Sequence, residues 1–385
     1  MQLSDRKQAG NLLGLAELIV EEELCLNLRG RLMHCSACRD ICPADALELT
    51  PDSVDVDETR CTGCNSCLPS CSAGALRSTA FLPERFLQAL SASGLTDLHC
   101  RISEDGGGGV VIPCHTVLDA RLLAAARGDG VTQLRLHGLN RCADCRHGDA
   151  RAHIHSVIAR LAQWLGEEAP SLDLDPPAVC DNASDRRDYQ DQPHMDRRAF
   201  LRFGGAKGMT QAADWLLPGL SREEEDGEAL PFYQTNGYAQ RASAYQQALI
   251  ARAEHVPWRA SQPLPFMRRQ VSEDCSACLS CAERCPTGAL HASVSAQYRQ
   301  LSFDPAVCTD CGLCERICPE RAVLPEPLRD IKDLKAGRET LFSVSQQPCR
   351  QCGNPFLPMD TESDLCPVCN NEQELDEAWL EMLSG

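Results

Sequence analysis

The sequence predicts an α+β protein assembled from several small domains, on three observations. Of its 25 cysteines, 16 fall into four groups of four that form two pairs, one toward each end of the chain. Between the pairs, predicted strands alternate with predicted helices, which indicates a small α/β domain with a parallel sheet. Two further pairs of cysteines stand in the last 40 residues. A chain of 385 residues holds about two or three average domains, and the cysteine pattern divides this one more finely.

The four cysteine groups share one spacing. Two groups are complete and end with proline: Cys275, Cys278, Cys281, Cys285 and Pro286, then Cys308, Cys311, Cys314, Cys318 and Pro319. A third has Ser72 in place of proline: Cys61, Cys64, Cys67 and Cys71. The first keeps only Cys35, Cys38, Cys42 and Pro43, with Cys25 as the candidate for its fourth thiol. Short gaps let three thiolates bind one [4Fe-4S] cluster from a tight loop, while the last thiolate reaches a neighbouring cluster. The sequence therefore predicts four [4Fe-4S] clusters.

These groups carry a family resemblance. Residues 25–77 and 270–325 resemble two-cluster bacterial ferredoxin domains, which implies a βαββαβ fold with crosswise ligand sets. In the first copy, the resemblance assigns one cluster to Cys42, Cys61, Cys64 and Cys67, and the other to Cys35, Cys38 and Cys71. In the second, it assigns one cluster to Cys275, Cys278, Cys281 and Cys318, and the other to Cys285, Cys308, Cys311 and Cys314. After the last cysteine of each group we expect a turn of helix that packs an alanine against a cluster: Ala46, Ala75, Ala289 and Ala322.

The incomplete first group leaves the ligands of one cluster open. Leu32 stands where its first cysteine is expected, so Cys25 would have to fold back from upstream. The alternatives are a labile cluster held by three cysteines, a substitute ligand such as His34, and loss of this cluster. Cys25 would then be a structural thiol, since free cysteine is among the most buried residue types. We expect Cys25 to be the fourth ligand.

Residues 80–168 form the predicted α/β domain. Helices are predicted at 83–90, 117–127 and 151–165, and strands at 98–102, 109–113 and 133–137. Four cysteines lie near the strand ends, where α/β domains bind ligands: Cys100, Cys114, Cys142 and Cys145. The segments around Cys114 and 142–145 resemble the delta subunit of methyl-viologen-reducing hydrogenases, an iron–sulfur partner of heterodisulfide reductases. The thiols fit a [2Fe-2S] cluster, a second zinc ion, or a redox-active or structural set. Three nearby histidines are not expected to be ligands: His115, His137 and His147.

Residues 170–268 are predicted to be a polar linker with an amphipathic helix. Residues 181–192 are highly polar, and Cys180 stands apart from the cysteine groups. Residues 197–205 resemble a twin-arginine export motif, but such a signal works at a free N-terminus. We interpret the segment as the basic start of a helix, ending near Leu220, that docks between domains. Mimicry of a signal, for contact with an export chaperone, and a false start site are the alternatives.

Residues 345–372 are predicted to form a zinc ribbon, followed by a tail at 373–385. Two CxxC pairs separated by 13 residues can enclose one tetrahedral metal ion: Cys349 and Cys352, then Cys366 and Cys369. Rubredoxin-type iron uses similar pairs, but the short intervening loop favours zinc. Metal binding would fold a segment that otherwise lacks an apolar core.

Charge and hydropathy restrict the partners. The formal net charge of −18 disfavours nucleic acid and anionic membranes and favours a redox partner with a basic patch, although acidity also serves solubility alone. No apolar run reaches the length of a membrane span. Residues 11–20 are expected to form an amphipathic helix rather than a signal peptide. The cysteines therefore indicate reduced metal ligands in the cytoplasm.

The sequence favours electron transfer over catalysis. It has no glycine fingerprint for a nucleotide, no flavin or nicotinamide motif and no nucleophile–base set. We expect a multi-cluster electron carrier with ferredoxin-like domains at 1–78 and 269–328. By analogy it resembles accessory subunits of bacterial oxidoreductases, molybdenum formate dehydrogenases among them. Two alternatives come from other classes: a maturation factor that stores or delivers clusters or sulfur to a client enzyme, and a redox sensor gated by the thiols of the middle domain.

Overall fold

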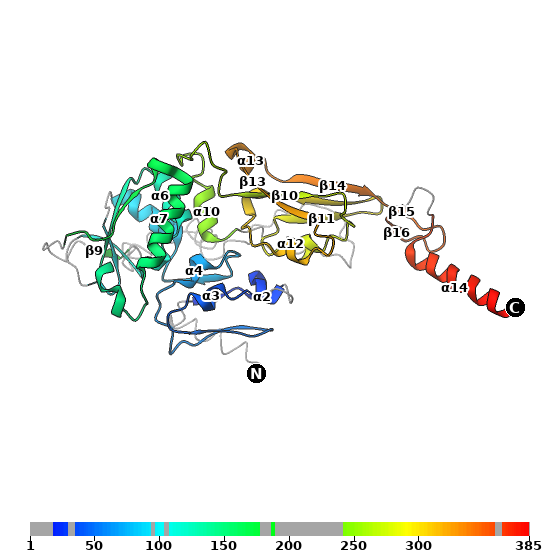
Figure 1. The fold of residues 1–385 in the computed structure, drawn as a ribbon, viewed down its shortest axis with the longest axis horizontal. Coiled ribbons are helices and arrows are strands. Elements are labelled where there is room, and N and C mark those ends of the chain that lie inside the picture. The colour runs from blue at the N-terminus through cyan, green and yellow to red at the C-terminus, as the bar shows by residue number, and fades with distance from the viewer. Residues whose placement is uncertain are drawn as a thin grey trace, which may run out of the picture.

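The computed structural model describes residues 18–29, 35–93, 97–103, 108–177, 186–188, 242–358 and 364–384. Cys180 and the predicted helix at 197–220 lie outside these residues. Figure 1 shows a first unit in blue, a middle domain in cyan and green, and a second unit in yellow and orange. A red C-terminal helix points away from all three. We call residues 18–78 the first unit and residues 267–327 the second unit.

The first unit has the element order β-α-β-β-α-β. Its elements are β1 (Leu18–Val20), α3 (Ala37–Asp40), β2 (Leu47–Leu49), β3 (Val54–Val56), α4 (Cys67–Ser70) and β4 (Leu76–Ser78), with the short helix α2 (Leu26–Arg29) between β1 and α3. β1 pairs antiparallel with β4, and β2 pairs antiparallel with β3. The helix expected at 11–20 was wrong at its end, because residues 18–20 are extended and pair with β4; residues 11–17 lie outside the described part of the chain.

The middle domain is built on a parallel sheet, as the alternation of strands and helices predicted. The strand order is β8-β7-β5-β6-β9, and every pairing is parallel. The strands are β5 (Asp97–Cys100), β6 (Gly109–Ile112), β7 (Gln133–His137), β8 (Ser171–Asp173) and β9 (Arg186–Asp188). The helices are α5 (Pro83–Ser93), α6 (Ala120–Gly128) and α7 (Arg151–Leu165). The predicted strand at 133–137 and helix at 151–165 are confirmed residue for residue.

The predicted linker at 170–268 is structured at both ends. At one end, β8 and β9 extend the sheet of the middle domain past its predicted boundary. At the other, helix α10 (Ala244–Ile250) packs against α6. It buries Tyr245, Ala248 and Leu249, which stand at helical spacing on one face. The polar composition of the whole segment hid these short apolar stretches.

The second unit repeats the order β-α-β-β-α-β. Its elements are β10 (Met267–Val271), α11 (Ser280–Glu283), β11 (Leu290–Val294), β12 (Tyr298–Phe303), α12 (Leu313–Ile317) and β13 (Val323–Pro327). β10 pairs antiparallel with β13, and β11 with β12. After α13 (Ile331–Lys335), strand β14 (Glu339–Ser345) pairs with β12 and widens that sheet to three strands.

The chain ends in a small knuckle and a helix. These elements are β15 (Gln347–Pro348), β16 (Pro355–Phe356) and α14 (Pro367–Ser384). Leu375, Trp379 and Leu380 are exposed on α14, which extends away from the other elements in Figure 1. Neither α14 nor any other helix of the described residues combines the length and apolar composition that crossing a membrane would require.

Two large apolar cores stabilise the first unit, the middle domain and the second unit. The larger one is shared, because it contains Leu47 and Leu76 of the first unit together with Leu98 and Leu136 of the middle domain. The second unit has a smaller core of its own, centred on the residues of β11 and β12. The first unit therefore shares its core with the middle domain, whereas the second unit has a core of its own.

Candidate metal centres

The thiols of the first unit gather in two sets of four. Cys25, Cys35, Cys38 and Cys71 line one cavity, and we call this set the Cys25 cradle. Cys42, Cys61, Cys64 and Cys67 line a second cavity, the Cys61 cradle. The structure thus places Cys25 beside the other three thiols of the incomplete group. Each cradle takes its last thiol from the other cysteine group, which is the crosswise arrangement that the family resemblance implied.

The second unit holds two further sets. Cys275, Cys278, Cys281 and Cys318 line one cavity, the Cys275 cradle. The remaining thiols act electrostatically on one another and form the Cys308 cradle, which consists of Cys285, Cys308, Cys311 and Cys314. All 16 cysteines of the four groups therefore lie in sets of four.

The loops between the cysteines have an unusual backbone. Residues in the two-residue gaps of three groups adopt positive φ: Gly63 (68°), Asn65 (61°), Ala277 (53°), Leu279 (63°), Asp310 (51°) and Gly312 (71°). Four of these six residues are not glycine. For Ala277 and Leu279, which lack the short polar side chain of Asn and Asp, this conformation costs about 1–2 kcal/mol each. Strain of this kind persists where a site requires it. Here it turns the loop around the space that the thiols enclose.

The backbone also donates hydrogen bonds to sulfur after the last cysteine of a group. The N–H of Ala46 lies 3.4 Å from Cys42 Sγ, that of Ala75 3.2 Å from Cys71 Sγ, and that of Ala322 3.3 Å from Cys318 Sγ. The expected turn of helix was wrong at these places, because the residue before each alanine has positive φ: Asp45, Gly74 and Arg321. That left-handed residue points the next N–H back at the sulfur. The four alanines are buried as expected.

The chemistry of these sets fits an iron–sulfur cluster. Burial raises the pKa of Cys281 and Cys308 to about 12, and neighbouring thiols add to the rise at both. The pKa of Cys67 is also raised by burial and by the thiols around it. Buried thiols held close together ionise with difficulty unless a cationic centre lies among them. A metal core supplies that charge, and only thiolates bind it.

The four cradles lie in a row that crosses from one unit to the other. In the first unit, Cys67 of the Cys61 cradle interacts with Cys38 of the Cys25 cradle. In the second unit, Cys281 of the Cys275 cradle interacts with Cys314 of the Cys308 cradle. The order within the row depends on what lies between the units.

A small apolar cluster joins the two units at this point. Leu26 and Ala73 of the first unit pack with Leu313 of the second, between the thiols of Cys35 and Cys71 on one side and that of Cys311 on the other. Figure 1 shows α2 and α12 facing each other here. The Cys25 and Cys308 cradles are therefore neighbours, and the row runs from the Cys61 cradle through these two to the Cys275 cradle.

We call the contact at Leu26, Ala73 and Leu313 the joint. Two arginines also bridge it by donating hydrogen bonds to backbone carbonyls. Arg29 Nη2 donates to Glu283 O at 3.0 Å, and its Nε donates to Arg284 O at 3.2 Å. In return, Arg284 Nη1 donates to Arg29 O at 2.7 Å. This reciprocal contact fixes α2 against the end of α11 and so fixes the spacing of the row.

Three of the four cysteines of the middle domain line one cavity, and the fourth does not. Cys100, Cys142 and Cys145 line an open cavity of about 340 Å³ at the carboxyl ends of β5 and β7. Cys114 does not line it; this thiol is 4% exposed and interacts with both Cys64 and Cys100. Burial raises the pKa of Cys114 to about 12 and also raises the pKa of Cys142, whereas an attacking dithiol needs a lowered one.

Direct contacts place the middle-domain thiols beside the Cys61 cradle. Thr116 Oγ1 lies 2.6 Å from Ser66 Oγ, which in turn donates to Cys64 Sγ at 3.2 Å. A Cβ built on Gly148 would lie 2.9 Å from Cβ of Pro43, the residue after Cys42. Cys114 thus lies between the open cavity of the middle domain and the row of cradles.

The histidines of the middle domain are engaged elsewhere. His115 Nε2 lies 2.9 Å from His137 O, and His137 Nε2 lies 2.7 Å from Asp97 Oδ1. Burial lowers the pKa of His115 to about 4. His147 is buried, and the Thr62 backbone holds its ring. None of these contacts directs an imidazole at the cysteines that line the open cavity.

The tail brings its four cysteines closest together. The Sγ atoms of Cys349, Cys352, Cys366 and Cys369 all lie within 4.8 Å of one another. Cys352 Sγ and Cys366 Sγ are 3.8 Å apart, which is about the edge of a tetrahedron with Zn–S bonds of about 2.3 Å. The N–H of Cys366 donates to Cys349 Sγ at 3.2 Å. The set fits a single tetrahedral ion rather than a cluster.

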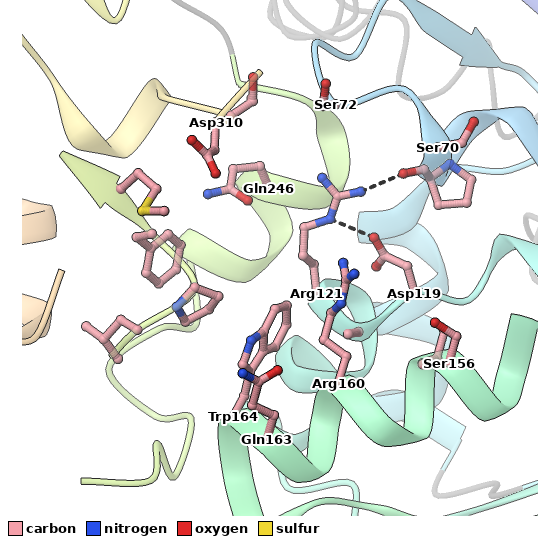
Figure 2. Close-up of a pocket in the computed structure, with 18 of the residues that line it drawn as sticks. Ser70, Ser72, Asp119, Arg121, Ser156, Arg160, Gln163, Trp164, Gln246 and Asp310 are labelled. Atoms are coloured by element: carbon pink, nitrogen blue, oxygen red, sulfur yellow. Dashed lines mark hydrogen bonds and ion pairs between the residues drawn. The ribbon is translucent and has the colours of Figure 1, made fainter. Parts of the chain in front are cut away.

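A larger cavity of about 650 Å³ lies where the first unit, the middle domain, α10 and the second unit meet (Figure 2). Arg121 is fixed at its wall, since Nε donates to Asp119 at 2.6 Å and Nη2 to Pro69 O at 2.9 Å. Cys308 and Asp310 also line it, and Figure 2 shows Asp310 on the side opposite the middle domain. This cavity brings solvent to the edge of the Cys308 cradle. Sequence reasoning did not find it, because its walls come from four distant segments.

Comparisons with known proteins support the second unit most directly. A family model described as a 4Fe-4S binding domain matches residues 301–324, which contain Cys308, Cys311, Cys314 and Cys318. "Ferredoxin 7Fe" of Hydrogenibacillus schlegelii is 43% identical over 47 residues, 12% of this chain and 55% of that protein. The methylamine utilization ferredoxin-type protein MauM of Methylobacillus flagellatus is 36% identical over 79 residues, 18% of this chain and 32% of that protein. Ferredoxin-1 of Rhodobacter capsulatus is 26% identical over 72 residues, 18% of this chain and 92% of that protein.

These similarities are local. The chain spans about half of the first relative and a third of the second, and most of its own length lies outside the matches. The family model covers one complete cysteine group, from Cys308 to Cys318. The chain therefore contains a ferredoxin-type domain that binds at least one [4Fe-4S] cluster, and iron–sulfur electron transfer is the function that this similarity supports.

Proposed function

We propose that this protein is a multi-cluster electron carrier in which four [4Fe-4S] clusters form one conducting row. The 16 cysteines of the four cradles are the proposed ligands, Cys25 among them. The observation that carries the proposal is the joint at Leu26, Ala73 and Leu313, which brings the Cys25 cradle of one unit against the Cys308 cradle of the other. Two isolated ferredoxin domains would not need such a contact, whereas a continuous electron path does.

The cradles are suited to electron transfer because their geometry is fixed. Strained loops and N–H donors hold the sulfur atoms in place, so little rearrangement would accompany a change of charge. Hydrogen bonds to sulfur and burial are also the means by which proteins set cluster potentials. The residues of this chain therefore position clusters and tune them, while the clusters supply the redox chemistry.

The partner is proposed to be another redox protein with a basic surface, since the net charge is −18. An accessory role beside a bacterial oxidoreductase of the formate dehydrogenase type, in the cytoplasm, is our specific proposal. The alternative, a factor that delivers a labile cluster to a client, is less favoured. The Cys25 cradle, the candidate for such a cluster, is packed at the joint beneath Leu313.

Two smaller sites complete the proposal. Cys349, Cys352, Cys366 and Cys369 are proposed to bind one zinc ion. Cys100, Cys142 and Cys145, with Cys114 behind them, are proposed as a further centre, either a [2Fe-2S] cluster or a second zinc ion. A redox-active dithiol is less favoured, because the pKa of Cys142 is raised.

Metal analysis of anaerobically purified full-length protein tests this function. Four cubanes and one knuckle correspond to about 16 iron atoms and about one zinc ion, plus the metal of the middle domain. The middle-domain centre is identified by a Cys142→Ser, Cys145→Ser double variant: loss of about two irons indicates a [2Fe-2S] cluster, and loss of about one zinc indicates a zinc site. Folded protein with only about eight irons would contradict the row of four.

A further inference from the structure

A buried arginine lies next to one of the four cradles. Arg269 in β10 is 1% exposed and is the largest fully buried side chain of the described residues. It faces inward, while its neighbour Arg268 is partly exposed and pairs with Glu339 at 2.7 Å. A guanidinium is charged at all physiological pH values and is costly to remove from water. Its position therefore needs a reason.

The ion pairs of Arg269 involve only one of its three guanidinium nitrogens. Nη2 lies 2.7 Å from Asp310 Oδ1 and 3.2 Å from Glu315 Oε1. Nε and Nη1 are both buried and have no hydrogen-bond partner within the described parts of the chain. A buried donor left unpaired is destabilising, so two of them on one cation indicate that an acceptor belongs beside them.

The acceptors in reach are the sulfur atoms of the Cys308 cradle. The guanidinium lies beside Cys308 and within hydrogen-bonding reach of Cys314. Asp310 and Glu315 carry opposite charge but are on the solvent side, with side chains 50% and 33% exposed. Asp310 also borders the cavity of Figure 2, so water screens its charge more than that of the buried cation.

The other cradles have different neighbours. Other thiols and backbone N–H groups act on Cys38, Cys67 and Cys71. In the Cys275 cradle, Glu320 lies 3.7 Å from Cys318 Sγ and also acts on Cys275. Arg299 approaches this cradle only through the Ala277 carbonyl, at 3.4 Å. The second unit thus places a buried cation beside one cradle and an acidic group beside the other.

We propose that Arg269 gives the cluster in the Cys308 cradle the highest reduction potential of the four, so that an electron in the row resides there first. This inference rests on the proposed function, since it needs clusters in the cradles. A reduced cluster carries one more negative charge, and a buried cation with free N–H donors at its sulfurs stabilises that charge. The favoured position is third in the row, beside the joint between the units. An electron that enters at either end then moves downhill toward the joint.

The test is an EPR-monitored redox titration of the anaerobic full-length protein. In wild type, one of four one-electron components should titrate at a higher potential than the others. Arg269→Gln should move that component to lower potential, and Arg269→Lys should retain most of the original value. Arg268→Gln is the matched control, one residue away on the opposite face of the same strand, and should leave all four components in place.

Assignment of the component uses the cysteines themselves. Cys311→Ser should alter the component of highest potential, whereas Cys278→Ser should alter a different one. This pair decides the inference even if Arg269→Gln does not fold. An Arg269→Gln protein with full iron content and unchanged potentials overturns the inference, as does a highest component that survives in Cys311→Ser. A wild-type protein without four clusters overturns the proposed function instead.

Discussion

The first and second units follow one plan but are stabilised in different ways. Both have the order β-α-β-β-α-β, and both share cysteines crosswise between two cradles. The first unit takes one thiol from outside the regular spacing, at Cys25, and shares its core with the middle domain. The second unit uses regular spacing throughout, has its own core and buries Arg269. The plan therefore fixes where thiols meet, while the surroundings decide how each site is supported and tuned.

The largest expected effects come from removing one cluster thiol, either one outside the regular spacing or one within it. Cys25 and Cys275 occupy equivalent places in their cradles, although only Cys275 has regular spacing. The test changes each of them to serine, as Cys25→Ser and Cys275→Ser. We expect each to remove about four irons or to leave a three-iron cluster, because a cubane needs four protein ligands. Iron analysis and EPR measure both outcomes. Cys180→Ser, outside the four groups, is the control; if Cys25→Ser matches that control, Cys25 is a structural thiol.

The same substitution made in each of the two cores should destabilise different parts of the protein. Phe81 and Phe303 are each 1% exposed, one in the shared core and one in the core of the second unit. Each change to alanine should cost about 3–5 kcal/mol. Phe81→Ala should lower iron retention in the first unit and destabilise the middle domain as well, because the Phe81 ring lies 5.6 Å from that of Phe86 in α5.

Phe303→Ala should spare the first unit. Hydrogen exchange of the two variants, read separately over 18–78 and over the sheet of the middle domain, distinguishes these outcomes. Independent behaviour of the first unit and the middle domain in Phe81→Ala would contradict a shared core.

The smallest expected effect concerns two glycines with similar φ. Gly74 has φ of 73° and Gly312 has φ of 71°. A Cβ on Gly74 would lie 2.7 Å from Ser243 Cα, whereas nothing lies within 4 Å of one on Gly312. Gly312→Ala should cost about 1–2 kcal/mol from backbone strain alone, and Gly74→Ala should cost about 1–3 kcal/mol more from the contact. Thermal unfolding measures the difference, and equal losses would show that Ser243 moves aside freely.

The sequence predicts the thiol sets better than their surroundings. Gaps between cysteines constrain a short loop, so the grouping of Cys61, Cys64 and Cys67 could be anticipated locally. Periodicity likewise located α7 and β7, which are long and regular. Arg269 could not be anticipated, because its partner Asp310 is 41 residues away and the burial of its guanidinium beside Cys314 depends on the tertiary fold.

Other differences arise from contacts between distant segments. Strands β8 and β9 have three residues each and gain their order from pairing with β7 and β6. A three-residue strand carries too little periodicity to be seen in a polar stretch. The sequence groups Cys114 with three other thiols because it follows a strand, but in the structure this thiol is buried near Cys64.

During synthesis, the first unit leaves the ribosome well before the segments that cover it. Gly74 rests against Ser243, and Val117 in the middle domain accepts the hydroxyl of Tyr245 at 2.9 Å. At roughly 5–20 residues per second, many seconds pass between the emergence of Cys71 and that of α10. During this interval the early thiols are open to oxidants and to competing metal ions. The second unit avoids this delay, because its cysteines and its core lie close together in the sequence. The N-terminal cysteines are therefore the ones whose loading with iron depends most on a reducing environment and a prompt supply of the metal.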